Sequence, residues 1–327
     1  MNIYITYGII FVILLVMELV YFKIADKCNI IDKPNLRSSH STIVLRGGGI
    51  IFLIGAWLYI AFYGLHYIWF MIGLTAITAI SFIDDIHSVP NKYRLIVHFV
   101  SISLMFIDLG LFNKESWWII PIALIVCVGI INAYNFMDGI NGITGGYSLA
   151  VLIPLVYLNH TLNFIDKHLL IVCILSVLIF CFFNFRKKAK CFAGDVGAVG
   201  IAFILLFALG KLILHTHDIT YLMLLGIYGV DTILTIVHRI MLHENLGEAH
   251  RKHAYQIMAN ELKIPHTIVS FIYMGLQLAV SFGLIFLPLN HWIYTISMVI
   301  VLVISYILFM RKYYYLHEQY LQSNKKS

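Results

Sequence analysis

Residues 117–146 read WWIIPIALIVCVGIINAYNFMDGINGITGG. An apolar run of membrane-spanning length ends in an island of amides, one carboxylate and glycines, and a second apolar run follows at once. Asn135, Asp138 and Asn141 recur at intervals of three, so a helical turn or its frayed end would place them near one face. The pattern predicts two membrane helices joined by a connection that carries chemistry. A plain glycine-rich turn with polar caps is the alternative.

The four glycines of this island indicate a second property of the connection. Gly139, Gly142, Gly145 and Gly146 let the backbone approach a ligand closely and open its N–H groups to anionic oxygens. Asn and Asp oxygens suit Mg2+, which shares its remaining coordination positions with water and substrate phosphates. We therefore expect a site for Mg2+ and phosphate in this connection.

The composition excludes a soluble globular protein. Of the 327 residues, 61% are hydrophobic and 12% are charged, and the mean hydropathy is +0.90. A membrane helix needs about 20 apolar residues, and about eleven such runs can be marked. We expect an all-α polytopic membrane protein that forms one domain over residues 1–327. The runs lie at 3–22, 46–63, 65–83, 95–112, 117–133, 143–159, 167–185, 196–215, 220–238, 266–287 and 291–310.

The distribution of positive charge indicates an orientation. Nineteen of the 22 Lys and Arg residues fall on one side of the expected membrane, and the other side holds Lys114, Lys167 and Lys211. Because cytoplasmic loops carry such an excess, we expect an outside N-terminus, a cytoplasmic C-terminus and every polar loop in the cytoplasm. The first run lacks the flanks of a signal peptide and is expected to stay. The five cysteines contain no C-x-x-C pair and are expected to be reduced packing residues.

The loop at residues 32–50, DKPNLRSSHSTIVLRGGGI, offers donors for phosphate. Arg37, His40 and Arg46 supply side-chain donors, and the glycines at 47–49 open the next run with bare backbone. A positively charged membrane anchor would explain the charges but not the glycines, since glycine inside a helix costs about 1 kcal/mol relative to alanine.

Asp84 and Asp85 stand at the membrane end of a predicted helix. Two carboxylates at such a depth need a cation, a proton or water, so the pair is a candidate functional site. A simple polar boundary at a helix C-terminus is the alternative, although the helix dipole disfavours anions there. Arg94 follows in the same loop and would either hold a phosphate or pair with these aspartates.

Two further segments carry polar side chains toward the same side. Asp195 lies at the start of a run, where it would bind a metal or simply cap the helix. Phe192 would stack on a nucleobase or belong to the aromatic belt.

The loop at residues 238–264 gathers basic side chains suited to a diphosphate, whose charge grows during phosphoryl transfer. A zinc site is disfavoured because no third ligand stands at the usual spacing. Asp231 is expected inside the membrane with a basic group of the site as its partner. The basic residues are His238, His243, His250, Arg251, Lys252 and His253.

The order of these motifs resembles that of the polyprenyl-phosphate N-acetylhexosamine-1-phosphate transferases, the MraY/WecA superfamily, over about residues 25–260. The motifs are the aspartate pair at 84–85, N-x-x-N-x-x-D-G-x-N-G at 132–142, F-x-G-D at 192–195 and the basic loop. K-P-N-x-R-S-S-H, R-G-G-G-I and E-A-H-R-K-H-A-Y-Q further resemble the WbpL-like branch, which starts O-antigen or capsule repeats.

The resemblance implies a reaction in which a UDP-N-acetylhexosamine and undecaprenyl phosphate give undecaprenyl-diphospho-HexNAc and UMP. It implies Mg2+, with Mn2+ as the alternative, and a multi-pass protein of the bacterial cytoplasmic (inner) membrane. The active site would face the cytoplasm and use loops near 23–50, 84–94, 132–146, 186–197 and 238–264. Homodimers are expected, and nucleic acid is not expected as a partner. The motifs do not distinguish GlcNAc from FucNAc or QuiNAc.

The resemblance also assigns roles to individual residues. Asn135 and Asp195 match metal ligands, and Asn141, Phe192 and Asp138 match a uracil pocket. The basic loop matches a pyrophosphate-binding cluster through His250, Arg251 and His253.

The aspartate pair, Asp84 and Asp85, matches groups that position or deprotonate the lipid phosphate. Ser88 departs from the family, which often has a charged residue there. Direct attack of the lipid phosphate on the β-phosphate is the preferred mechanism, and a route through a phosphorylated Asp84, Asp85 or Asp195 is the alternative.

Two other classes of protein compete with this interpretation. A secondary transporter would place its polar groups near mid-membrane between internal repeats, whereas these polar groups lie in loops on one side and no repeat is evident. A non-catalytic sugar-lipid sensor would not need the intact Asp84, Asp85, Asn135 and Asp195.

Overall fold

The computed structural model describes residues 3–34, 39, 42–112, 117–248 and 250–324, and these are almost entirely helical. The expected all-α class is confirmed. Only a two-stranded antiparallel sheet interrupts it, with Ile31 opposite Leu45. The elements are α1 (Ile3–Lys27), β1 (Ile31–Asp32), β2 (Val44–Leu45), α2 (Ile50–Tyr63), α3 (Ile68–Ile86), α4 (Asn91–Leu109), α5 (Ile119–Met137), α6 (Ile143–Leu162), α7 (Lys167–Asn184), α8 (Gly194–Thr216), the 3-10 helix η1 (Ile219–Leu225), α9 (Gly226–Met241), α10 (Ala254–Asn260), α11 (His266–Phe286) and α12 (His291–Asn324).

Each predicted apolar run corresponds to a helix, and the run at 220–238 divides into η1 and α9. Among the described residues, eight helical segments are long and apolar enough to cross a membrane, with η1 and α9 counted together. α2 is apolar but has only 14 residues. A polytopic membrane protein is therefore confirmed, and the count of eleven spans stays a prediction.

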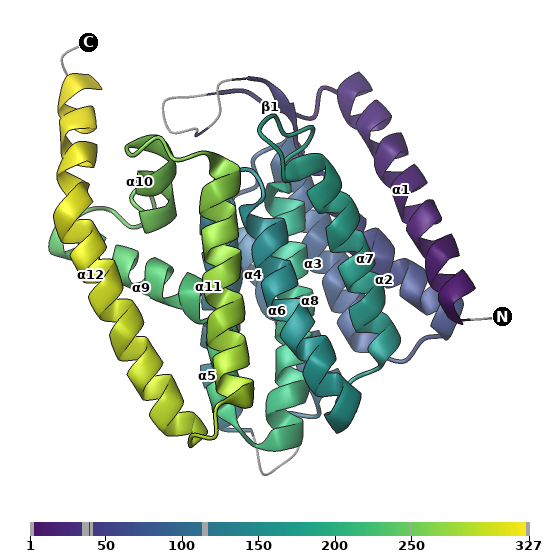
Figure 1. The fold of residues 1–327 in the computed structure, drawn as a ribbon. Helices are drawn as coiled ribbons and strands as arrows, with labels where there is room; N and C mark the ends of the chain where they lie inside the picture. Colours follow the sequence, from purple (N-terminus) through teal and green to yellow (C-terminus); the bar gives the residue numbers. More distant parts are fainter. Residues whose placement is uncertain (1–2, 35–38, 40–41, 113–116, 249, 325–327) are drawn as a thin grey trace.

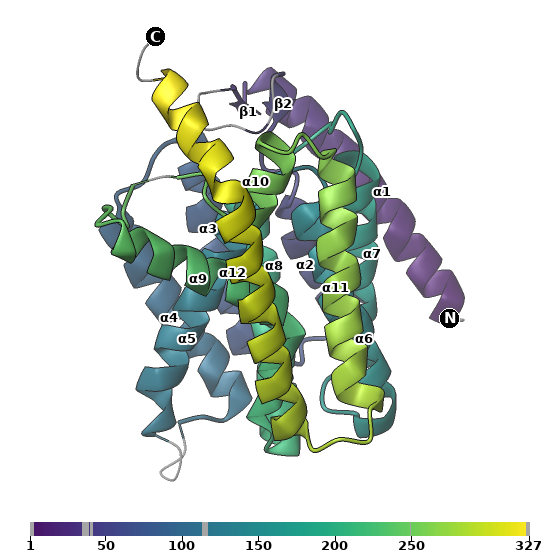
Figure 2. The ribbon, with the colours of Figure 1, turned by 60° about the vertical axis from the view of Figure 1, so that its left-hand side comes forward.

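The polar segments meet at one end of the bundle. β1, β2, α10 and the C-terminus lie there, and the start of α1 points the other way (Figures 1 and 2). α9 lies across the direction of its neighbours in both views. The predicted grouping of the loops on one side agrees with this arrangement, and the compartment they face stays a prediction.

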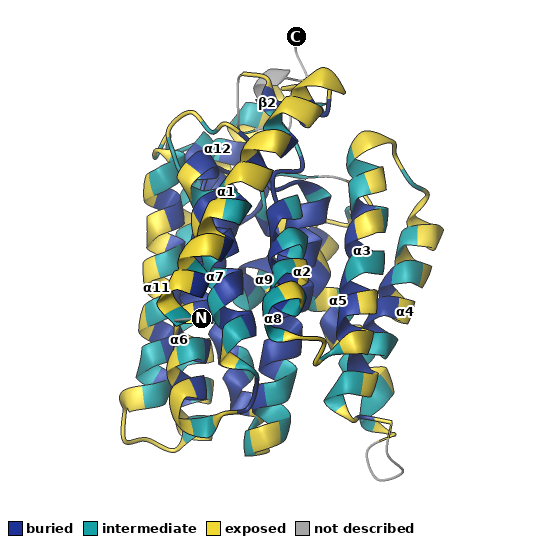
Figure 3. Ribbon diagram, turned by 90° about the vertical axis from the view of Figure 1, so that its right-hand side faces the viewer, coloured by how far each residue is buried: buried dark blue, intermediate teal, exposed yellow. Residues whose placement is uncertain are grey.

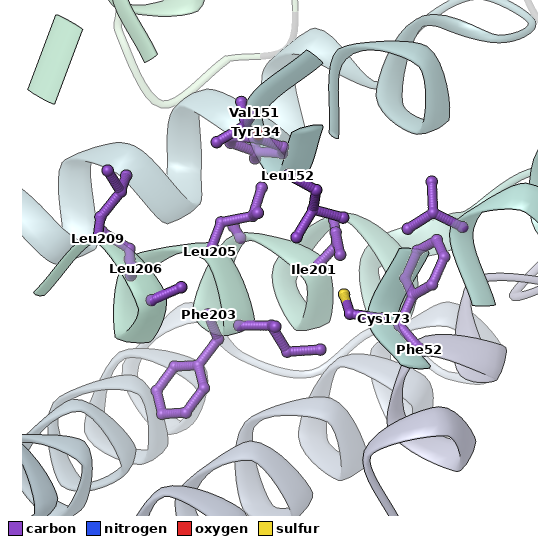
Figure 4. Close-up of a cluster of buried hydrophobic side chains, with 14 of the residues drawn as sticks. Phe52, Tyr134, Val151, Leu152, Cys173, Ile201, Phe203, Leu205, Leu206 and Leu209 are labelled. Atoms are coloured by element: carbon purple, nitrogen blue, oxygen red, sulfur yellow. The ribbon is translucent and has the colours of Figure 1, made fainter. Parts of the chain in front are cut away.

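Helix α8 forms the centre of the core. Its side chains Ile201, Phe203 and Leu205 are buried, and residues from α2, α5, α6 and α7 surround it (Figure 4). Along α1, by contrast, much of the surface is exposed (Figure 3). Exposed apolar side chains such as Val12 and Val301 are typical of helices that face lipid.

The starts of α2 and α8 touch through glycine. A Cβ atom on Gly49 would overlap the Cα of Gly197, so neither position accepts a side chain without movement of the backbone. The N–H groups of Gly48 and Gly49 donate to the carbonyls of Phe192 (2.9 Å) and Ala193 (3.1 Å). The expectation that this triplet presents free N–H groups to phosphate is therefore wrong at these two positions, because close helix packing uses them.

We expect Gly49→Ala to destabilise the protein by roughly 2 kcal/mol because the added methyl group forces α2 away from α8. Thermal unfolding in detergent should show a Tm lowered by roughly 5 °C. Gly275→Ala in α11 is the matched control, since nothing lies within 4 Å of the added atom. Equal melting temperatures for the two variants would contradict this packing role.

Candidate active site

Asp85 joins the end of α3 to the start of α8. Its Oδ1 accepts a hydrogen bond from the backbone N–H of Asp195 (2.9 Å), and its Oδ2 accepts one from that of Val196 (3.0 Å). The carboxylate thus caps α8 from another helix. Gly194 makes this approach feasible, because its φ of +70° and the nearby Asp85 carboxylate leave no room for a Cβ.

Two arginines connect three carboxylates. Arg46 pairs through Nε with Asp85 Oδ1 (2.7 Å) and through Nη2 with Asp195 Oδ1 (3.3 Å). Arg94 pairs through Nη1 with Asp84 Oδ2 (2.6 Å) and through Nη2 with Asp195 Oδ2 (3.0 Å). Of the two alternatives for Arg94, pairing with the aspartates is the one observed. Segments far apart in the sequence therefore share one charged network.

The residues of the amide and carboxylate island lie around the same cavity, as their spacing predicts. Asn135 is in the last turn of α5, Asp138 follows its end and Asn141 precedes α6. The Asn135 side chain hydrogen-bonds to the Asp195 carboxylate. Asp138 Oδ1 accepts a hydrogen bond from Thr144 Oγ1 (2.5 Å). The island is thus a helix end and a turn that bring amide and carboxylate oxygens together.

Asp138 is half-buried, and no ion pair with a described residue compensates its carboxyl group. Burial raises the pKa of its carboxyl to about 7, and the charges of Asp195 and Asp85 add to the rise while the hydrogen bond from Thr144 opposes it. Near neutral pH this carboxyl therefore exchanges a proton readily, and a cation bound beside it would favour the ionised form.

The glycines of the island serve packing rather than anion binding. The N–H of Gly142 donates to Asn184 Oδ1 (2.7 Å), and that of Gly146 donates to the carbonyl of Gly142 (2.8 Å). A Cβ on Gly139 would overlap the Tyr255 hydroxyl. The expectation of free N–H groups for anionic oxygens is therefore wrong at positions 142 and 146.

Three neighbouring cavities surround these groups, and we name them by their lining. The acidic cavity, about 320 Å³, is lined among others by Asp32, Arg46, Asn135, Asp138, Asn141, Phe192 and Asp195. The basic cavity, about 860 Å³, is lined among others by Asn141, Lys187, Lys188, Phe192, Arg251, Glu261 and Lys263. The histidine cavity, about 480 Å³, is lined among others by Arg94, His98, Asn135, Asp195, Arg239, His250 and His253.

The acidic cavity connects the other two. It shares Asn141 and Phe192 with the basic cavity and Asn135 and Asp195 with the histidine cavity. Asn141 is fixed by hydrogen bonds from Nδ2 to the carbonyls at 186 (3.0 Å) and 187 (3.3 Å). Its buried Oδ1 has no partner among the described residues. The residues expected to hold a base and a metal thus line the same acidic cavity.

The predicted basic cluster is divided between two cavities. His250 and His253 line the histidine cavity, whereas Arg251 lines the basic cavity. Burial lowers the pKa of His250 to about 3, helped by the charges of His253 and Arg239, so this imidazole is uncharged at neutral pH. His238 packs against Tyr314. Neither His238 nor His243 lines any of the three cavities. Arg37 and His40 lie outside the described residues.

Asp231 has the basic partner that the sequence predicts. Its Oδ1 lies 3.2 Å from His253 Nδ1, and its Oδ2 accepts a hydrogen bond from the Tyr273 hydroxyl (2.6 Å). Because an ionised carboxylate only accepts hydrogen bonds, the contact with Asp231 indicates that Nδ1 of His253 carries a hydrogen. His253 Nε2 is buried, borders the histidine cavity and has no partner among the described residues.

Sequence inspection missed three residues that build the site. Asp32 on β1 lines the acidic cavity. Asn184 accepts from the Gly142 N–H and donates to the Cys191 carbonyl (2.8 Å), which joins two loops. Arg239 donates to three carbonyls of the loop at 245–248. A polar side chain in the last turn of an apolar run was the available signal for Asn184 and Arg239.

Several known proteins are similar in sequence to this chain. The family model for glycosyl transferase family 4 matches residues 67–212. The chain is similar to a probable undecaprenyl-phosphate N-acetylglucosaminyl 1-phosphate transferase of Bacillus subtilis (strain 168), with 25% identity over 79% of this chain and 78% of the relative. The corresponding Escherichia coli (strain K12) protein is 24% identical over 88% and 84%. A phospho-N-acetylmuramoyl-pentapeptide-transferase of Thermotoga maritima is 26% identical over 52% and 60%.

The family match and these relatives support the superfamily of polyprenyl-phosphate N-acetylhexosamine-1-phosphate transferases. The chain is therefore a sugar-1-phosphate transferase, as the motifs predict. The residues matched by the family model include Asp84, Asp85, Asn135 and Asp195 of this transferase. The basic loop lies beyond the matched residues. Its His250 and His253 nevertheless line the histidine cavity together with Asn135 and Asp195.

Asp231→Asn should lower transferase activity roughly a hundredfold, because the His253 ring loses the carboxylate that orients it at the border of the histidine cavity. His253→Ala should cost a similar factor. The double variant should be no slower than His253→Ala, since both changes remove one interaction. Losses that multiply in the double variant would contradict the coupling. Circular dichroism and Tm check that all three variants fold.

Proposed function

We propose that this enzyme transfers HexNAc-1-phosphate from a UDP-N-acetylhexosamine to undecaprenyl phosphate, giving undecaprenyl-diphospho-HexNAc and UMP. The observation that carries the proposal is the acidic cavity, which shares Asn141 and Phe192 with the basic cavity and Asn135 and Asp195 with the histidine cavity. Two substrates that both carry phosphate can then meet at one cluster of carboxylates. The names of the Bacillus and Escherichia relatives support the same pair of substrates.

The basic cavity suits the nucleotide. Lys187, Lys188 and Lys263 supply positive charge, and Phe192 and Asn141 stand where it meets the acidic cavity. A flat aromatic ring and an amide with an unpaired oxygen are groups that hold a base by stacking and hydrogen bonding. The roles of Asn141, Phe192 and Asp138 in uracil binding are part of this proposal.

The histidine cavity suits a phosphate carried by a lipid. Arg94, His250 and His253 line it, and the exposed apolar side chains of Leu95 and Leu246 lie at its border. A guanidinium and two imidazoles next to an apolar surface match a phosphate head group with a hydrocarbon tail. Undecaprenyl phosphate would enter here from the bilayer.

Direct displacement is the mechanism that the carboxylates favour. An oxygen of the lipid phosphate forms a bond to the β-phosphorus while the bond from that phosphorus to the UMP oxygen breaks. Every carboxylate oxygen of Asp84, Asp85 and Asp195 accepts a hydrogen bond or pairs with an arginine. Such engaged oxygens are poor nucleophiles, which argues against a phosphorylated aspartate. We assign Asp84 and Asp85 to positioning the lipid phosphate through Arg94 and Arg46.

The oxygens around Asp195 fit Mg2+, or Mn2+. Asn135 and Asp195 touch each other, and Asp138 adds a half-buried carboxylate to the same cavity. Among the described residues, no group of three or more His, Cys, Asp or Glu side chains is arranged to hold a metal ion. This agrees with a cation bound by one or two carboxylates and the substrate phosphates. Such an ion would supply neutralisation of the phosphate charge.

The location of the enzyme and its biosynthetic role in this proposal rest on the charge distribution and the motifs of the sequence. The positive charge on the side of the polar loops supports a site at the cytoplasmic face of the bacterial inner membrane. The WbpL-like motifs suggest that the product initiates an O-antigen, capsule or related surface glycan. The sugar is to be chosen among GlcNAc, FucNAc and QuiNAc by experiment.

The test uses purified enzyme with undecaprenyl phosphate, Mg2+ and a panel of UDP-HexNAc donors. We expect release of UMP and a lipid diphosphate-sugar of matching mass, both lost on removal of Mg2+ with EDTA. Asp195→Asn should lower the rate at least a hundredfold because it removes charge from the metal site. Phosphorylated protein formed from the donor alone would refute direct displacement. Absence of UMP with every donor would refute the transferase assignment to these substrates.

Mg2+ binding should strengthen as pH rises to about 7 and then level off. The raised pKa of Asp138 means that protons compete with the cation below that value, by up to about tenfold in affinity per pH unit. Isothermal titration with Mg2+ between pH 5.5 and 8 measures this dependence. Asp138→Asn should remove most of the slope. A slope that persists unchanged in this variant would show that another group is responsible.

A further inference from the structure

Helix α12 continues well beyond the apolar run that predicted it. The run ends at residue 310, whereas α12 extends to Asn324 and has 34 residues. At 1.5 Å per residue the helix is about 50 Å long, more than the roughly 30 Å of a hydrocarbon core. Its last turns stand beside α10 at the end of the bundle that carries the active site (Figures 1 and 2).

A buried ionic cluster fixes this extension to the active-site loop. Glu261 Oε1 lies 2.9 Å from Arg251 Nη2 and 3.0 Å from His317 Nδ1. The Arg251 guanidinium also lies 4.2 Å from the centre of the Tyr320 ring. The side chains of Glu261 and His317 are only 4% and 1% exposed, so water screens this cluster weakly. The extension therefore has a defined position against α10.

The same helix face borders the basic cavity. Leu316, Gln319 and Tyr320 line it, at the spacing that places side chains on one face of a helix. Lys187 and Lys188 line this cavity from the loop after α7. An apolar side chain, an amide and an aromatic ring thus line the same cavity as two lysines, a combination suited to a nucleotide.

The chemistry indicates which substrate reaches this helix face. In an in-line displacement, the attacking oxygen and the leaving group lie on opposite sides of the phosphorus. The basic and histidine cavities share no lining residue, and each shares residues with the acidic cavity between them. If the lipid phosphate attacks from the histidine cavity, the UMP group leaves toward the basic cavity and α12.

We propose that the segment of α12 from Leu316 to Tyr320 is part of the binding site for the nucleotide of the sugar donor. Gln319 supplies a hydrogen-bonding amide, and Leu316 and Tyr320 supply apolar contact. The proposal rests on the proposed function for the identity of the ligand. It adds a determinant of donor affinity outside the four motifs of the superfamily.

The experiment compares Gln319→Leu and Leu316→Ala with the wild-type enzyme. Glu318→Gln is the matched control, because Glu318 is an exposed neighbour on the same helix that does not line the cavity. We measure KM for the UDP-sugar, KM for undecaprenyl phosphate, kcat, and the Kd of UMP by calorimetry. Both test variants should raise the donor KM and the UMP Kd roughly fivefold, the effect of about one lost contact. The lipid KM, kcat and the control should stay unchanged.

The outcomes separate this inference from the proposed function. Wild-type turnover with unchanged donor KM and UMP Kd in both variants would overturn the role of α12 and leave the transferase reaction intact. A higher lipid KM, or a lower kcat with unchanged UMP Kd, would show that α12 only supports Arg251. Failure of the wild-type enzyme to release UMP would refute the proposed function, and failure to bind UMP would overturn both. Melting temperatures check that the variants fold.

Discussion

The active site depends on the contact between the Asp85 carboxylate and the first N–H groups of α8. A buried carboxylate is stable only where donors and opposite charge surround it, and here two backbone amides and Arg46 do so. The same contact fixes Asp195, whose own N–H is one of the donors. The end of α3, the start of α8 and the loop before α2 therefore form one unit, and the position of the reacting groups follows from it.

The sequence predicts the helices well because the length and hydropathy of each run are local properties. The predicted boundaries are wrong where tertiary contacts decide them. The run at 220–238 contains no proline, yet η1 ends at Leu225 and a separate helix, α9, begins at Gly226. α9 lies across the direction of the neighbouring helices (Figure 1). Gln277 of α11 stabilises this junction, since it accepts from the Ile227 N–H and donates to the Met223 carbonyl. Such a partner, 50 residues away in the chain, leaves no mark on the pattern of the run itself.

The site shows the same division between local and distant information. The spacing of Asn135, Asp138 and Asn141 reports their common cavity because one helix end and turn carries them all. The expectation that glycine N–H groups bind anions is wrong at positions 48, 49, 142 and 146, because their N–H groups have partners within the protein. Gly49 meets Gly197, and Gly142 meets Asn184, from segments that the sequence cannot place beside them. Arg251 lines a different cavity from His250 and His253 for a similar reason, because its guanidinium pairs with Glu261.

The extension of α12 has a consequence for biosynthesis. The carboxylates, amides and histidines of the site all precede α12 in the chain, so a ribosome delivers them to the membrane first. Until α12 has been translated and inserted, Glu261 lacks His317 and the basic cavity lacks one of its walls. The residues of the acidic and histidine cavities are therefore synthesised before the wall that α12 adds to the basic cavity.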